Sequence, residues 1–180
     1  MPIEKESKIV LKPEVSSIFN ITKRLPGMEK FFIFQLYLGG GARIRHRKNL
    51  QTQVKEYFFT YKKNISNDEE IEIETEISAD DFGMLVEHSE ESLIKVRFSI
   101  KTENAQWDLD AFHESLDRDD KPYFVMLEVE WLTDEQPDWS WIPEDIILKI
   151  VEDNSEYSSK KLSNINYAEQ SLKELGFRRI

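Results

Sequence analysis

The sequence predicts an α+β protein in which one antiparallel sheet or barrel predominates. Most apolar stretches alternate with polar residues at a period of two, which is typical of half-buried strands. Helical patterns are fewer and lie scattered among the strand patterns. Because 180 residues suit one domain with a substantial core, we assign residues 1–180 to a single domain.

The alternation is clearest in seven segments. These are 31–38, 42–47, 56–61, 71–77, 94–100, 107–112 and 124–131. Two stretches between them predict connections, the run Gly39-Gly40-Gly41 and the polar segment 63–69. The glycines lack the spacing of a phosphate-binding P-loop, so we do not interpret them as one.

Three segments predict helices. Segment 13–23 has a proline near its start. Segment 78–87 begins with Ser78, a good capping residue, and acidic residues follow in the first turn, where the helix dipole favours them. Segment 166–175 is followed by Gly176, a common helix terminator.

Composition excludes several classes of protein. The net charge of -11 opposes general binding to nucleic acid, which depends on neutralising phosphates. No apolar run is long enough to span a bilayer, and the first twelve residues do not resemble a signal peptide. The absence of cysteine excludes thiolate metal sites. We therefore expect a cytoplasmic protein without nucleic-acid or membrane partners.

Charged residues recur at a spacing of two, near the start of the chain and then as pairs of like charge along the predicted strands. The sets are Glu4, Glu6 and Lys8; Arg43 and Arg45; Glu72 and Glu74; Lys95 and Arg97; Asp108 and Asp110; Glu128 and Glu130. Residues i and i+2 of a strand point to the same face, roughly 7 Å apart. For any single pair, a face turned toward water is the usual explanation.

Six such sets of both signs also suit the inside of a barrel. Clustered carboxylates repel one another unless a metal neutralises them, and Mg²⁺ and Mn²⁺ prefer such oxygen ligands. Arginine and lysine beside them would bind phosphate oxygens. The charge pattern alone does not show which face of the sheet lies inside.

The order of these motifs resembles the CYTH, or triphosphate tunnel metalloenzyme, family over about residues 3–165. Glu4-Lys5-Glu6-Ser7-Lys8 is similar to the Glu-x-Glu-x-Lys signature that opens these domains. Later elements match in order: Gln35-Leu36-Tyr37-Leu38, Arg43-Ile44-Arg45, Thr60-Tyr61-Lys62, Glu72 with Glu74, Lys95-Val96-Arg97-Phe98, Asp110, Leu127-Glu128-Val129-Glu130 and the terminal segment with Tyr157. Two positions depart from the family pattern, where Glu70 replaces a frequent arginine and Ser159 a usual asparagine.

The resemblance implies a tunnel of eight antiparallel strands with a few flanking helices and a site in its lumen. The implied ligands of Mg²⁺ or Mn²⁺ are Glu4, Glu6, Asp110, Glu128 and Glu130. The implied triphosphate-binding residues are Lys8, Arg43, Arg45, Lys62, Lys95 and Arg97. The implied catalytic residues are Glu4, Glu6, Lys8, Glu128 and Glu130. Two choices stay open: Glu72 and Glu74 as a second metal site or as structural ion pairs, and Lys160 or Lys161 as a further cation.

The implied activity is metal-dependent hydrolysis of tripolyphosphate or of a small organic triphosphate. Two alternatives stay open, an adenylate cyclase that makes cyclic AMP from ATP and a tunnel that binds a triphosphate without turnover. Glu70 is the motive for the second alternative. The expected partner is a small-molecule triphosphate, and a homodimer is an open alternative for the assembly.

The remaining candidates for chemistry are weaker. The three histidines lack metal-ligand spacing, and we expect them at the surface or in packing, with His46 facing away from Arg45. The four tryptophans, Trp107, Trp131, Trp139 and Trp141, could stack on a ring of the ligand, but such residues more often pack a core or a barrel wall.

Overall fold

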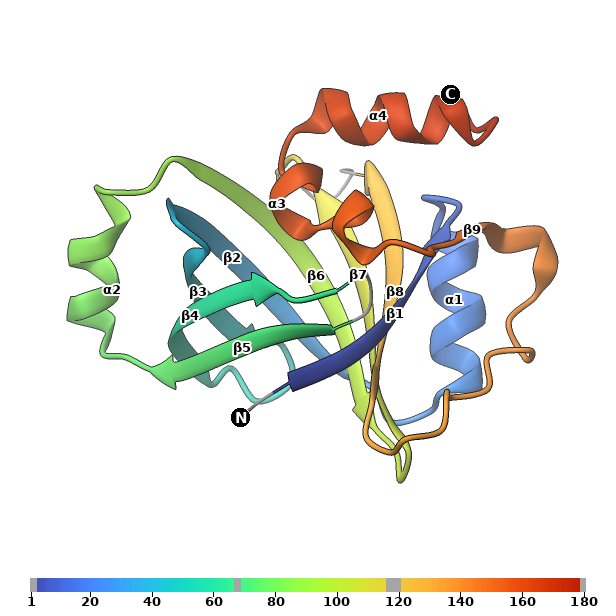
Figure 1. The fold of residues 1–180 in the computed structure, drawn as a ribbon, viewed down its shortest axis with the longest axis horizontal. Helices are drawn as coiled ribbons and strands as arrows, with labels where there is room; N and C mark the ends of the chain where they lie inside the picture. Colours follow the sequence, from blue (N-terminus) through green and yellow to red (C-terminus); the bar gives the residue numbers. More distant parts are fainter. Residues whose placement is uncertain (1–2, 67–68, 116–120, 179–180) are drawn as a thin grey trace.

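Eight antiparallel strands close into a barrel in the computed structural model, which describes residues 3–66, 69–115 and 121–178 (Figure 1). The strands are β1 Ile3–Leu11, β2 Glu29–Gly39, β3 Ala42–Asn49, β4 Lys55–Asn64, β5 Glu69–Glu76, β6 Glu91–Lys101, β7 Ala105–His113 and β8 Phe124–Trp131. A short further strand, β9 (Ile147–Ile150), pairs with β1. The predicted α+β barrel of eight strands is confirmed.

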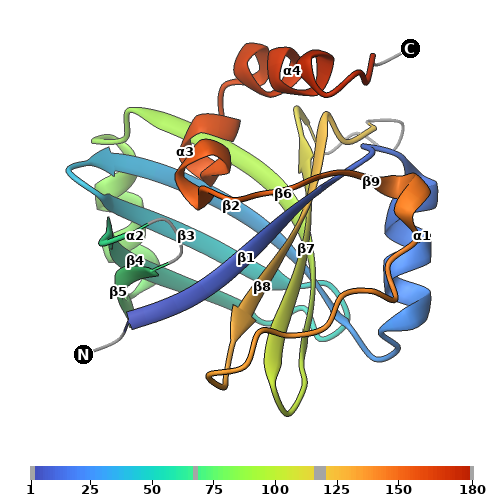
Figure 2. The same ribbon diagram turned by 45° about the vertical axis from the view of Figure 1, so that its right-hand side comes forward.

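The barrel consists of two four-stranded halves. One is the meander β2 to β5, and the other is the meander β6 to β8 with β1 added beside β8. Pairing of β2 with β6 joins them on one side, and pairing of β1 with β5 closes the other. The closing contact is short and involves Ile3, Glu4 and Lys5 of β1, whereas β9 pairs with the opposite end of β1. Figure 2 shows β1 crossing the barrel between these two partners.

Helices cover the barrel at its sides and at one end. They are α1 Val15–Arg24, α2 Ala79–Val86, α3 Ser159–Leu162 and α4 Ile165–Glu174, with short 3-10 turns η1 Glu144–Ile146 and η2 Asn154–Tyr157. In both ribbon views α1 and α2 lie on opposite sides, and α3 and α4 lie across one end. The three predicted helices are confirmed, and the Ser78 side chain caps α2 as expected.

Outward-facing apolar side chains form the core between the barrel wall and the helices. Leu109 and Leu127 are fully buried there. Trp107 packs edge-to-face on Trp141 at 5.5 Å between ring centroids, so these two rings belong to the core outside the lumen. His46 stacks on Tyr57 on the outer surface beneath α2, which confirms that it faces away from its neighbour Arg45.

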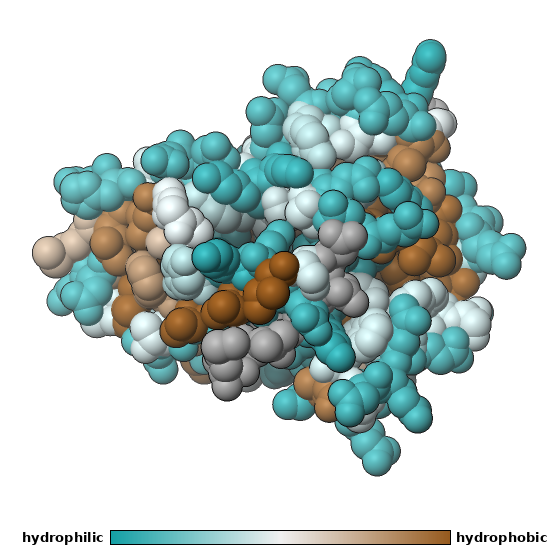
Figure 3. Space-filling model, in the orientation of Figure 1, coloured by the Kyte–Doolittle hydropathy of each residue, from teal (hydrophilic) through white to brown (hydrophobic). Residues whose placement is uncertain are grey.

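One part of the barrel wall is left without a helix. On the outer face of β4 and β5, Tyr61 and Ile73 lie opposite each other and are 37% and 55% exposed. Figure 3 shows the apolar surface that crosses this region. Nothing in the structure shows what covers it, and a homodimer therefore stays a prediction. Within the described residues, no helix has the length and apolarity that a membrane span requires.

The glycine run between β2 and β3 makes the turn that places Lys62 of β4 beside the strand end. All three glycines have positive φ, and Gly41 (φ 86°) accepts a hydrogen bond from the Lys62 amide at 2.9 Å. A Cβ at Gly41 would lie 2.5 Å from the Lys62 carbonyl oxygen, whereas a Cβ at Gly40 would have no neighbour within 4 Å. Close backbone approach therefore requires glycine at position 41.

Gly41→Ala should destabilise the protein more than Gly40→Ala. Both changes place alanine at positive φ, which costs about 1–2 kcal/mol. Gly41→Ala adds a clash with backbone, worth roughly 1–3 kcal/mol more. Urea unfolding of both variants would measure the two losses, and equal losses would contradict this account of the turn.

Candidate functional site

The barrel encloses a cavity of about 570 Å³, and the described residues that line it include eight acidic and eight basic side chains. Inward and outward residues alternate along each strand, so the charge pairs at spacing two project into the lumen. The cavity brings together these predicted site residues: Glu6, Lys8, Arg43, Arg45, Lys62, Lys95, Arg97, Glu128 and Glu130. Glu4 lies on β1 in register with Glu70, but its side chain is outside the described part of the structure.

The two aspartates of β7 occupy different environments. Asp110 has no exposed surface, and both of its oxygens accept charged hydrogen bonds, from Lys95 at 2.5 Å and from Arg97 at 2.6 and 2.7 Å. Asp108 lines the cavity. Asp108 is therefore the acid of this strand that reaches the lumen, whereas Asp110 fixes two cations from behind.

Arg97 is neutralised by three carboxylates. Besides Asp110, it donates to Asp108 and to Glu128, each at 2.7 Å. Burial alone would raise the pKa of Glu128, but Lys95 and Arg97 outweigh burial and hold this pKa well below its usual range. Burial, reinforced by Arg97, lowers the pKa of Lys95 to about 8. Such a network holds Arg97 in one orientation.

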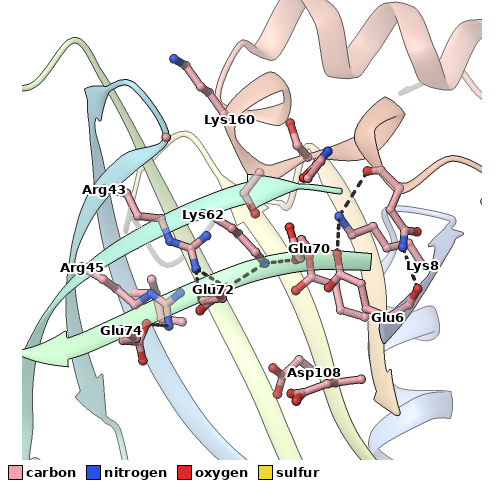
Figure 4. Close-up of a pocket in the computed structure, with 18 of the residues that line it drawn as sticks. Glu6, Lys8, Arg43, Arg45, Lys62, Glu70, Glu72, Glu74, Asp108 and Lys160 are labelled. Atoms are coloured by element: carbon pink, nitrogen blue, oxygen red, sulfur yellow. Dashed lines mark hydrogen bonds and ion pairs between the residues drawn. The ribbon is translucent and has the colours of Figure 1, made fainter. Parts of the chain in front are cut away.

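A second network joins β3, β4 and β5. Glu72 lies 3.3 Å from Arg43 and 2.9 Å from Lys62, and Lys62 also contacts Glu70 (Figure 4). Glu74 accepts a hydrogen bond from Thr60 at 2.9 Å and lies 3.7 Å from Arg45. These contacts favour structural ion pairs as the role of Glu72 and Glu74.

The C-terminal segment ties down the strand that carries Glu6 and Lys8. Between the stretches of β1 that pair with β5 and β9, the Asn154 amide donates to the Glu6 carbonyl at 2.6 Å. Lys8 donates to the Asn154 carbonyl at 3.3 Å and lies 3.0 Å from the Glu6 carboxylate. The same segment brings Lys160, rather than Lys161, to the cavity, 6.0 Å from the Tyr37 ring centroid.

Carboxylates also lie close to one another in the lumen. Burial, followed by the charges of Asp108, Glu72 and Glu6, raises the pKa of Glu130. The raised pKa reflects repulsion between acidic groups, and a divalent cation would stabilise their charged forms. Their hard oxygen atoms suit Mg²⁺ or Mn²⁺. Within residues 3–66, 69–115 and 121–178, no three such side chains already converge on a metal position. Glu6 and Asp108 instead contact Lys8 and Arg97.

Two arginines of β3 keep nitrogen donors that no close carboxylate accepts from. The buried Nε of Arg43 has no hydrogen-bond acceptor among the described residues. Arg45 donates from Nε to the neutral side chain of Gln35 at 3.4 Å, and its carboxylate neighbour Glu74 is distant at 3.7 Å. Both line the cavity beside Tyr37. This side of the lumen can therefore accept anionic oxygen atoms.

Sequence reasoning missed several residues that shape the site. Asp108 was paired with Asp110 but not assigned to the lumen, and Gln35 and Asn154 are neutral, so no charge pattern marked them. Glu70 was noted only as a departure from the family pattern. It is buried and contacts Lys62.

Comparison with known proteins finds similarity in structure rather than in sequence. No family model matches the chain, and no curated protein does. The PH1012 protein of Pyrococcus horikoshii OT3 is 17% identical, with 98% of this chain and 92% of that chain covered and a TM-score of 0.50. A chain of the Schizosaccharomyces pombe Mediator head module is 8% identical, with 96% of each chain covered and a TM-score of 0.53.

A third structure is that of HpAC1 from Hippeastrum, which was described as having a dominant triphosphatase activity. It is 14% identical, with 98% of this chain and 88% of that chain covered and a TM-score of 0.42. At sequence identities of 8% to 17%, these similarities show the fold alone, because one fold can carry many functions. The fold and the charged lumen define the chain as an antiparallel β-tunnel, the architecture that the resemblance to CYTH domains implied.

Glu72→Gln should make stability less dependent on pH in acid. Burial opposes ionisation of Glu72, but Arg43 and Lys62 lower its pKa to about 2 from 4.5. A lowered pKa stabilises the fold above the unfolded value, and this stabilisation is lost as the pH falls through the folded value. Between about pH 6 and pH 3 the wild type should lose roughly 2 kcal/mol that Glu72→Gln does not lose.

Urea unfolding at both pH values measures this difference. Glu56→Gln, which removes a more exposed ion pair with Arg47, is the matched control and should follow the wild type more closely. An identical loss in wild type and Glu72→Gln would contradict the proposed role of Arg43 and Lys62.

Proposed function

We propose that the chain is a metal-dependent triphosphatase that hydrolyses tripolyphosphate or a small organic triphosphate in the lumen of its β-tunnel. The observation that carries this proposal is the charge arrangement of the lumen. Among the described residues that line it, acidic and basic side chains are equal in number, but Arg43 and Arg45 retain donor groups without a close carboxylate. The resemblance of the sequence motifs to CYTH domains supports the same activity.

The balance of charge supports a requirement for a metal. A triphosphate brings several negative charges into a cavity whose described lining residues carry acidic and basic groups in equal number. A bound divalent cation supplies positive charge that offsets the phosphates and the charge building on the leaving group. Glu6, Asp108 and Glu128 are the described carboxylates that would hold it. Asp110 acts behind them by fixing Lys95 and Arg97.

Side chains of the lumen bind the phosphates and accept the proton of the attacking water. Arg43 and Arg45 bind phosphate oxygens by charged hydrogen bonds, and Lys8 and Lys62 add positive charge nearby. Glu130, whose pKa is raised by burial and by neighbouring acids, accepts the proton of the attacking water. The water oxygen bonds to the terminal phosphorus, and the bond from this phosphorus to the bridging oxygen breaks.

A second function, binding without turnover, is favoured by the contact between Lys62 and Glu70. Lys62 is shared by Glu70 and Glu72. Burial opposes its charge, but the carboxylates of Glu6, Glu72 and Glu70 outweigh burial and raise its pKa. A lysine held by two carboxylates offers less charge to a phosphate. This arrangement would suit a tunnel that recognises a triphosphate but does not hydrolyse it.

Product analysis distinguishes these functions. The purified protein is incubated with tripolyphosphate, thiamine triphosphate or ATP, each with Mg²⁺ or Mn²⁺. We expect orthophosphate from at least one substrate, and Glu130→Gln should lower kcat roughly 100-fold or more. Glu87→Gln, on the exposed end of α2, is the matched control and should retain full activity.

Other products would contradict the proposal in defined ways. Cyclic AMP with pyrophosphate from ATP would identify an adenylate cyclase. Calorimetric binding of a triphosphate with no product would establish the binding tunnel and make Glu70→Arg the next variant. Full activity of Glu130→Gln would remove this residue from the reaction.

A further inference from the structure

The lumen face of β2 is neutral where the neighbouring strands are charged. Gln35 has no exposed surface, and Tyr37 is 6% exposed. The Gln35 amide donates from Nε2 to the Tyr37 hydroxyl at 2.6 Å, which turns its Oε1 toward Arg45 of β3. Arg45 is the register partner of Gln35 and donates from Nε to this Oε1 at 3.4 Å. The buried Gln35 amide is thus oriented by the Tyr37 hydroxyl and accepts a hydrogen bond from Arg45.

Most other cations of the lumen are held by carboxylates. Lys95 lies 2.5 Å from Asp110, and Arg97 contacts three carboxylates within 2.7 Å. Arg45 differs because its carboxylate contact, to Glu74, is 3.7 Å long. Burial, followed by Arg43, lowers the pKa of Arg45 to about 10, so its positive charge is poorly compensated. A site of this kind attracts an anion.

We propose that Gln35 is a positioning residue that presents Arg45 to a phosphate oxygen, and that Tyr37 fixes the orientation of the Gln35 amide. The inference rests on the proposed triphosphate function and assigns a role to two residues that do not themselves carry charge. A neutral acceptor fixes the guanidinium at Nε without neutralising it, which leaves the two terminal nitrogens available to the ligand.

The proposal depends on the absence of charge on the side chain at position 35. Glutamate has nearly the shape of glutamine, but at this position it would form an ion pair with Arg45, as the lumen carboxylates do with Lys95 and Arg97. Gln35→Glu therefore preserves packing and removes the uncompensated charge. Loss of one charged hydrogen bond to the ligand corresponds to roughly 10- to 100-fold in affinity.

Calorimetric titration of the full chain with tripolyphosphate and Mg²⁺ tests the proposal. Gln35→Glu should weaken binding roughly 10- to 100-fold. Asn64→Asp is the matched control, because it adds the same charge to the lining of the same cavity, six residues along β4 from the register partner of Arg45. It should weaken binding by less than about fivefold.

A double-mutant cycle with Arg45→Met separates positioning from a general effect of charge or folding. If Gln35 acts through Arg45, Gln35→Glu should change affinity little in the Arg45→Met background. Equal effects of Gln35→Glu and Asn64→Asp, or an effect of Gln35→Glu that persists without Arg45, would overturn the proposal.

A ligand-free measurement keeps this inference distinct from the proposed function. The Arg45 Nε–H should give a slowly exchanging signal in a ¹⁵N NMR spectrum of the wild type, and the signal should exchange faster in Gln35→Leu and, less strongly, in Tyr37→Phe. A rapidly exchanging Arg45 Nε–H in the wild type would overturn the positioning role. Absence of any polyphosphate binding with a protected Arg45 signal would instead contradict the proposed function alone.

Discussion

Closure of the barrel gathers eight acidic and eight basic side chains of the described residues around a cavity of about 570 Å³, and their mutual neutralisation is the constraint on which the site depends. Buried charges are tolerated only when they are paired and hydrogen-bonded. The short contact between β1 and β5 creates this constraint, because it turns faces that an open sheet would expose to water into the wall of a lumen. The same closure puts Glu6 and Lys8 of β1 across from the charges of β4 and β5. Asn154 supports the edge of β1 that faces away from β8, between its pairings with β5 and β9.

Pairing is uneven around the lumen, and this unevenness gives the two sides different chemistry. On β6, β7 and β8, Arg97 is held by three carboxylates, so this side is rigid and electrically compensated. On β3, Arg43 and Arg45 keep donor groups that no close carboxylate satisfies. The carboxylate of Glu130 lies among other acids, and their repulsion raises its pKa. A ligand that carries both a divalent cation and anionic oxygens complements this arrangement, whereas a bare polyanion would meet the acidic groups unscreened. The proposed triphosphatase activity follows from this complementarity.

Alternation at a period of two predicted seven of the eight barrel strands, β2 to β8, and most of the lumen, because it specifies both the strand and the face. The strand β1 was not among these segments and was implied only by the resemblance in motif order. Alternation did not show which face lies inside, since an amphipathic strand exposes its charges equally well to water. The resemblance in motif order to CYTH domains indicated that the charged face lies inside the barrel. Asp108 and Asp110 could not be distinguished, because their difference in depth arises from packing against Lys95 and Arg97 across the sheet. Gln35 was noted only as part of a strand motif, and Asn154 was missed, because neutral residues leave no charge pattern. The strand β9 was missed because it is only four residues long.

Calorimetric titration of the protein with tripolyphosphate, performed once with Mg²⁺ and once with EDTA, tests the charge balance of the lumen most directly. It requires no turnover, so it addresses the site whether the protein hydrolyses the ligand or only binds it. If the lumen neutralises itself, tripolyphosphate should bind in the presence of Mg²⁺, and removal of the metal should weaken binding at least about 100-fold, the loss expected when several charges are left unscreened. Equal affinity with and without the metal would contradict the account, because it would mean that the basic side chains alone neutralise the ligand.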